Sequence, residues 1–165
     1  VLSFFTTYAA IDGYDPRSWQ APAVAERPDI DRWILSVLQS LARDVNVEME
    51  AYRLYTVVPR LVSFIDDLTN WYVRRSRARF WKSEDDRDKG SAFATLYEVL
   101  SIFSKILAPF MPFLTEVVYQ RLVRVVDDAA PASVHWCDYP RAEVALIDES
   151  LERRMATVRA ISTLI

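Results

Sequence analysis

Glycine is scarce in this sequence. Only Gly13 and Gly90 occur among 165 residues, where average usage of about 7% would give roughly a dozen. Dinucleotide-binding loops, P-loops and nucleophile elbows each need several closely spaced glycines, so none of them can be built here. The length suits one domain, and 52% hydrophobic residues are enough for a packed core.

Histidine and cysteine each occur once, as His135 and Cys137. This excludes an intramolecular disulfide, a multi-cysteine zinc site and a two-histidine metal site. A catalytic Cys/His pair also needs an orienting third group, which the sequence does not indicate. Adjacent Asp66 and Asp67 diverge by about 100° on a helix, so we expect one to pair with an arginine and the other to be solvated. We predict no catalytic, cofactor or metal site.

The two ends of the chain resemble the interior of a longer sequence. The N-terminus has no basic stretch typical of a signal peptide and begins in mid-pattern, while the C-terminus stops within an apolar helical pattern. No apolar run of about 18 residues is free of charges, so we expect no membrane span. The chain is therefore expected to be a fragment.

Helical spacing of apolar residues dominates the chain after residue 28. Residues 1–28, interrupted by glycine and prolines, are expected to be an extended lead-in. Helices are predicted over about 30–51, 54–81, 88–107 and 112–125 and from about residue 148, with an extended strap over 132–140. The predicted fold is an all-α bundle of four to five helices over 29–165, preceded by an irregular lead-in over 1–28.

Positive charge is concentrated between residues 69 and 82, although the formal net charge of the chain is −3. This segment has no acidic residue, whereas helices on a protein surface normally alternate the two signs. Its basic residues are Arg74, Arg75, Arg77, Arg79 and Lys82. Such a segment on an acidic body produces a directional field.

On a helix the basic segment divides into two groups. One stripe, opposite the apolar residues Leu61, Ile65, Leu68 and Tyr72, contains Asn70, Arg74, Arg77 and Trp81. Guanidinium groups and an indole suit single-stranded RNA, because they bind phosphates and stack on bases. Arg75 and Arg79 are expected nearer the core, braced against carboxylates. A merely solvated helix face is the alternative interpretation.

Five runs of sequence together resemble one known family. They are Asp31–Ser36, Phe64–Trp81, Thr95–Leu100, Ala108–Glu116 and Ser133–Pro140. The chain is similar over nearly its whole length to the anticodon-binding helical domain of the isoleucyl-tRNA synthetases, within the class I aminoacyl-tRNA synthetases. The run at 70–77 favours the isoleucyl group over the related valyl enzymes. Ala78 departs from the family by interrupting its usual basic run.

The resemblance implies a tRNA-binding fragment of a cytoplasmic, ATP-dependent isoleucine–tRNA ligase. Its expected partners are the anticodon stem and loop of the isoleucine tRNA and the catalytic and C-terminal domains of the same protein. The catalytic and editing sites, the ATP site and any zinc would lie elsewhere in that protein. The predicted RNA-binding residues are Asn70, Arg74, Arg77, Trp81 and Lys82, with Arg75 and Arg79 supporting. The alternative is a protein-docking module whose arginine-rich face binds an acidic partner.

Overall fold

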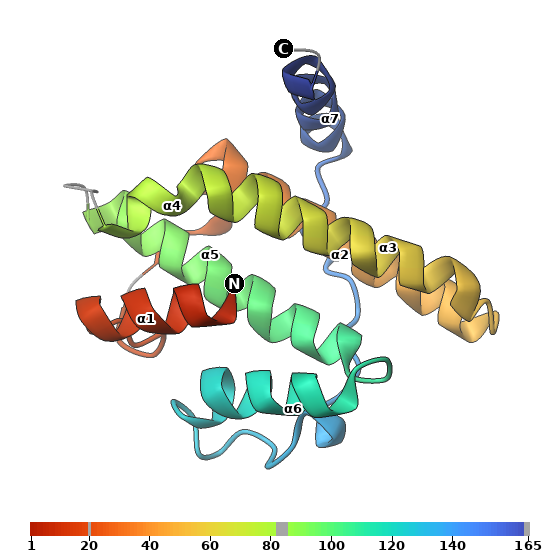
Figure 1. Cartoon of the computed structure of the whole chain (residues 1–165), viewed down its shortest axis with the longest axis horizontal. Coiled ribbons are helices and arrows are strands. Elements are labelled where there is room, and N and C mark those ends of the chain that lie inside the picture. Colours follow the sequence, from red (N-terminus) through yellow and green to blue (C-terminus); the bar gives the residue numbers. More distant parts are fainter. Residues whose placement is uncertain (20, 82–85, 164–165) are drawn as a thin grey trace.

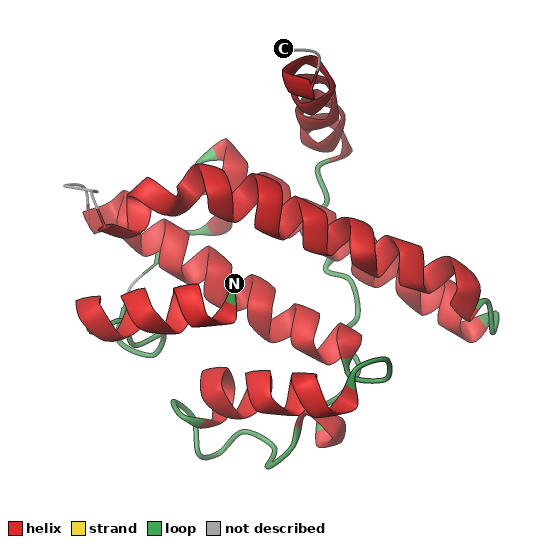
Figure 2. Cartoon of the chain, in the orientation of Figure 1, coloured by secondary structure: helices red, strands yellow, loops and turns green. Residues whose placement is uncertain are grey.

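The computed structural model of the protein describes residues 1–19, 21–81 and 86–163, which form helices joined by loops (Figure 2). The α-helices are α1 (Leu2–Asp12), α2 (Asp29–Glu50), α3 (Leu54–Asp66), α4 (Arg74–Trp81), α5 (Asp86–Leu107), α6 (Pro112–Tyr119) and α7 (Glu149–Thr163). No β-strand occurs among these described residues. The predicted all-α class is confirmed.

Helices α2, α3 and α5 enclose the main core. Helix α2 pairs with α3 in a hairpin whose closed end extends beyond the rest of the molecule (Figure 1), and α5 packs against α2. Core side chains repeat at helical spacing, as in Ile34 and Leu38 of α2 and Phe93 and Leu96 of α5, all completely buried. These positions agree with the sequence pattern.

The predicted helix over 54–81 is one continuous rod that contains a π-helical segment, Asp67–Val73, between α3 and α4. Among its buried side chains, one row recurs at every fourth residue, at Phe64, Leu68, Tyr72, Ser76 and Phe80. In an α-helix each four-residue step drifts about 40° around the axis. The wider turns of the π segment return these residues to the core.

Two predictions on the rod are wrong. Ile65, expected in the core, is 41% exposed, because Leu61 and Phe64 are the residues of this part of α3 that face the core. Arg75, expected on the side near the core, is exposed, because Ser76 is the residue that faces inward after the π segment.

The expected extended lead-in is wrong over Leu2–Asp12, which forms helix α1. Phe5 is buried against Phe93 of α5, and Asp12 forms a 2.7 Å ion pair with Lys89. Apolar residues on all sides of α1 obscure the helical period in the sequence. Gly13 was a usable signal, because it ends the helix in the left-handed conformation (φ 64°) that glycine adopts easily. Its backbone N–H donates to the carbonyl of Ala9.

The segment over 132–140 straps α6 to the bundle without forming a strand, as predicted, apart from a short 3₁₀ turn. Glu116 of α6 accepts hydrogen bonds from the Ser133 hydroxyl (2.9 Å) and the Val134 backbone N–H (3.0 Å). The hydroxyl of Tyr139 donates to the carbonyl of Ile106 at the end of α5 (3.0 Å). The strap therefore fixes α6 beside α5.

Helix α7 packs against α2 and projects from the bundle (Figure 1). Its Leu151 is buried, and Glu152 accepts hydrogen bonds from the hydroxyls of Ser36 and Ser40 on α2. Arg159, two turns further, forms ion pairs with Asp66 and Asp67 on the rod. These contacts join the last described helix to the π-helical segment.

Helix α5 is long and apolar enough to cross a membrane by length and composition alone. However, 67% of its most apolar window is buried inside the bundle. The core helix of a soluble protein has the same property, so this feature is weak evidence for a membrane span.

Candidate nucleic-acid interface

Arginine side chains gather on the outward side of α4. Arg74, Arg75 and Arg77 are all exposed. Within residues 1–19, 21–81 and 86–163, none of the three forms an ion pair with a carboxylate. Their donors are thus available to an anionic ligand.

Trp81 is the last residue of α4 and lies beside these arginines. Its side chain is 42% exposed, and the Arg77 guanidinium lies 5.8 Å from its ring centre. Tyr8 of α1 packs against the same indole, with ring centres 5.5 Å apart and an interplanar angle of 34°. Tyr8 is a neighbour that the sequence analysis missed, because residues 1–28 were not expected to form a helix.

Asn70 and Lys82 are the remaining residues that the sequence predicted for this surface. Asn70 is exposed, but its amide donates a 2.6 Å hydrogen bond to Asp66, one turn earlier. Lys82 lies outside the described residues. The structure therefore brings Arg74, Arg77 and Trp81 to one surface, with Asn70 beginning it in the π-helical segment.

Arg79 has a different environment on the same helix. It forms two 2.7 Å hydrogen bonds to the carboxylate of Asp31, which is completely buried, and it also pairs with Asp88. The Tyr72 hydroxyl donates to the same Asp31 carboxylate at 2.9 Å. The interpretation of Arg79 as a bracing residue agrees with these contacts, which join α2, the rod and α5.

The pKa values of Arg79 and Tyr72 in this buried network are both raised. Burial alone lowers the pKa of Arg79, but its hydrogen bonds to Asp31 and Asp88 outweigh that effect and raise the pKa overall. Burial, assisted by the charge of Asp31, raises the pKa of Tyr72 well above its ordinary value. Arg79 therefore stays cationic and Tyr72 stays a hydrogen-bond donor at neutral pH.

Arg75 does not brace a carboxylate, contrary to the sequence-based expectation. Its guanidinium carbon lies 3.8 Å from the ring centre of Trp71, within stacking distance. The register change in the π-helical segment is the cause, because it turns Arg75 outward and leaves it over the indole.

The two adjacent aspartates of the rod bind a single arginine. Arg159 of α7 pairs with Asp67, which is buried, whereas Asp66 stays solvated, with its side chain 56% exposed; this agrees with the expectation, except that Arg159 also lies 3.5 Å from Asp66. Burial raises the pKa of Asp67, and the Arg159 guanidinium opposes part of that shift. The pair has a structural task, because it holds α7 against the rod.

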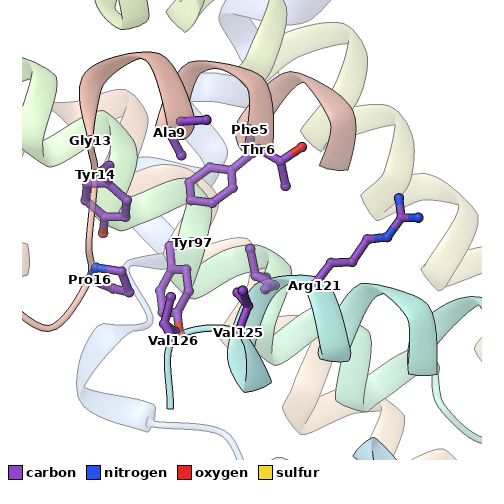
Figure 3. Close-up of a pocket in the computed structure, with 12 residues that line it drawn as sticks. Phe5, Thr6, Ala9, Gly13, Tyr14, Pro16, Tyr97, Arg121, Val125 and Val126 are labelled. Atoms are coloured by element: carbon purple, nitrogen blue, oxygen red, sulfur yellow. The ribbon is translucent and has the colours of Figure 1, made fainter. Parts of the chain in front are cut away.

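Two further features lie outside the outward side of α4. Among the described residues no three His, Cys, Asp or Glu side chains converge on a possible metal position. An apolar cleft of about 420 Å³ lies between α1 and the segment that follows α6, with Phe5, Tyr14 and Tyr97 in its lining (Figure 3). Burial raises the pKa of both tyrosines, so they remain neutral hydroxyls near pH 7. The cleft is separate from the outward side of α4.

Comparison with known proteins identifies the class of this domain. Residues 31–165 match the family described as the anticodon-binding domain of tRNA ligase, and the chain belongs to that family. The curated relatives it matches include the isoleucine–tRNA ligases of Chlamydia pneumoniae, 51% identical over 162 residues, and of Chlamydia muridarum, 50% identical over 163 residues. These alignments cover 98% and 99% of this chain but 15% of each relative. The chain thus spans a small part of the length of these relatives.

Proposed function

We propose that this domain binds the anticodon stem and loop of the isoleucine tRNA through the outward side of α4. The observation that carries the proposal is the exposure of Arg74 and Arg77 with no carboxylate partner among the described residues. Phosphates bind such guanidinium groups in a bidentate manner. Trp81, with a partly open ring beside Arg77, supplies a stacking surface for an unpaired base.

The domain contributes binding and orientation to the reaction, and no chemical step. In this proposal a cytoplasmic, ATP-dependent isoleucine–tRNA ligase contains the domain and performs aminoacylation at a site outside the chain. Residues 1–28 lead in from the catalytic part, residues 29–165 form the binding bundle, and C-terminal parts of the same protein share the tRNA. Lys82 belongs to the proposed contact set by its position after Trp81.

Footprinting on two tRNAs tests the proposal. The intact natural protein is bound to transcripts with an isoleucine or a valine anticodon, and cleavage of each tRNA is compared with and without protein. We expect protection of the anticodon arm in the isoleucine tRNA and weaker protection in the other. Protection elsewhere only, or none, contradicts the proposal.

A salt titration separates RNA binding from protein docking. Several phosphate contacts predict a log-linear loss of affinity with salt, with a slope of about −0.7 to −0.9 per contact. Unlabelled tRNA should displace the bound tRNA, and an acidic polypeptide of equal charge should do so poorly. Preferential displacement by the polypeptide would favour a protein-docking module instead.

A further inference from the structure

Arg75 is the arginine whose environment differs most from the one that its sequence position suggests. Its guanidinium carbon lies 3.8 Å from the centre of the Trp71 ring, and the side chain is exposed. No carboxylate of the described chain pairs with it. Stacking on an aromatic face uses the plane of a guanidinium and leaves the N–H groups at its edge free for other acceptors.

Trp71 lies at the edge of the core. The indole is partly buried against the core, and a second arginine, Arg159 of α7, lies 5.6 Å from its ring centre. Arg159 is already paired with Asp66 and Asp67, so its charge is compensated within the protein. Of the two guanidinium groups near this indole, Arg75 is the one whose charge is not compensated by a described carboxylate.

We infer that Arg75 is a pre-positioned phosphate-binding residue and that Trp71 is its positioning residue. The ligand is a backbone phosphate of the tRNA that lies across α4, so the inference rests on the proposed function. An exposed arginine normally loses side-chain freedom when it binds. Stacking on Trp71 restricts the side chain beforehand, so less freedom is lost when the fork grips a phosphate.

The geometry also places the proposed contact near α7, because Arg75 and Arg159 both lie over Trp71. Arg74 and Arg77 lie on α4, whereas Trp71 belongs to the π-helical segment that precedes it. A phosphate held at Arg75 therefore lies near the junction of the rod with α7, where Arg159 makes its ion pairs. The tRNA backbone would pass close to this junction.

Two substitutions of Arg75 test its role in the intact natural protein by salt titration of tRNA binding. Arg75→Gln removes one phosphate contact and should reduce the salt slope by about 0.7–0.9 and the affinity by about 5-fold. Arg75→Lys keeps the charge but not the planar fork, so the slope should be retained while affinity falls by about 3-fold. Arg53→Gln, at the far end of the rod, makes the same change of charge and should alter neither quantity.

A double-mutant cycle tests Trp71, with Trp71→Phe chosen because the smaller ring preserves an apolar contact with the core. We expect this variant to lower affinity by about 2-fold, because it offers a smaller and weaker stacking surface. In the Arg75→Gln background the same change should have no further effect, because no stacked guanidinium remains. A merely structural role of Trp71 would lower affinity equally in both backgrounds, and this would overturn its assignment.

The outcomes also separate this inference from the proposed function. Arg74→Gln and Arg77→Gln are titrated beside Arg75→Gln. If those two reduce the slope and Arg75→Gln does not, the inference is wrong and the proposed interface stands. If none of the three reduces it, both are wrong.

Discussion

Arg75 and Arg79 lie four residues apart on the same rod and have opposite surroundings. Arg79 has a side chain 15% exposed and binds two carboxylates, one of them completely buried. Arg75 is exposed and contacts an indole instead of a carboxylate. A run of arginines is therefore not one functional unit. Register decides which guanidinium holds the bundle together and which is left for a ligand.

A second buried arginine supports this distinction. Arg27 has a side chain 4% exposed and forms a two-point pair with Glu98, with a further hydrogen bond to Thr95. It connects the segment before α2 to α5, as Arg79 connects the rod to α2 and α5. Both residues combine burial with a carboxylate, which marks a structural arginine in this fold.

The largest expected effect comes from breaking the buried network. Arg79→Ala leaves the buried Asp31 carboxylate without its cationic partner and should reduce the free energy of unfolding by about 3–5 kcal/mol. Urea denaturation measures the change. Arg79→Lys keeps the charge, so its free energy of unfolding should lie between those of the original protein and Arg79→Ala. Arg77→Ala on the exposed side is the matched control and should change stability by less than about 0.5 kcal/mol. Equal losses for Arg79→Ala and Arg77→Ala would remove the distinction between the two sides of α4.

Trp81→Ala is expected to have the next largest effect, on tRNA affinity. Loss of base stacking should weaken binding by about 1–3 kcal/mol while the salt slope stays constant, because no charge is removed. Trp81→Phe retains a ring against Tyr8 and should recover part of the affinity. Wild-type affinity in Trp81→Ala would place this indole off the path of the RNA.

Arg74→Ala and Arg77→Ala change the exposed side of α4. Each should reduce the salt slope of tRNA binding by about 0.7–0.9, because each removes one phosphate contact. Thermal unfolding of the same variants should match that of the original protein, since neither residue pairs with a described carboxylate. An unchanged slope would show that the arginine in question does not bind a phosphate.

The fold was largely predictable because its main signal is local. Apolar residues at helical spacing located α2, α5 and most of the rod, and Pro112 marked the start of α6. Helix α1 was not predictable from periodicity, because its apolar residues surround the whole helix. The π-helical segment was missed because α-helical spacing was assumed throughout, and its effect on register became visible only in the packing of Ser76 and Phe80.

The candidate site was likewise predictable only in part. The exposure of Arg74, Arg77 and Trp81 followed from helical geometry, and the structure agrees with it. The stacking of Arg75 on Trp71 and the contact of Tyr8 with Trp81 were missed. The first depends on the π-helical segment and the second on α1, and neither element was predicted from the sequence. Binding of RNA by these residues stays a prediction.

The smallest expected effect concerns an arginine that is exposed yet paired. At the start of α3, Arg53 and the Thr56 hydroxyl both hydrogen-bond to Glu48, and these contacts lower the Glu48 pKa to about 2. A carboxyl whose pKa is lowered by folding stabilises the folded protein fully at pH values above its ordinary pKa of 4.5. This contribution is lost as the pH falls toward the folded-state pKa of about 2. Glu48→Gln should therefore be less stable than the original protein at pH 6, and the gap should narrow at pH 3.

Urea denaturation at the two pH values measures the gap. Glu50→Gln, two residues further along α2, is the matched control and should show a smaller change between them. Because the pair is near the surface, the effect at pH 6 should stay well below that of Arg79→Ala. If Glu48→Gln at pH 6 lost as much free energy of unfolding as Arg79→Ala, a carboxylate partner without burial would be enough to make an arginine structural. The contrast between Arg75 and Arg79 would then depend on pairing alone.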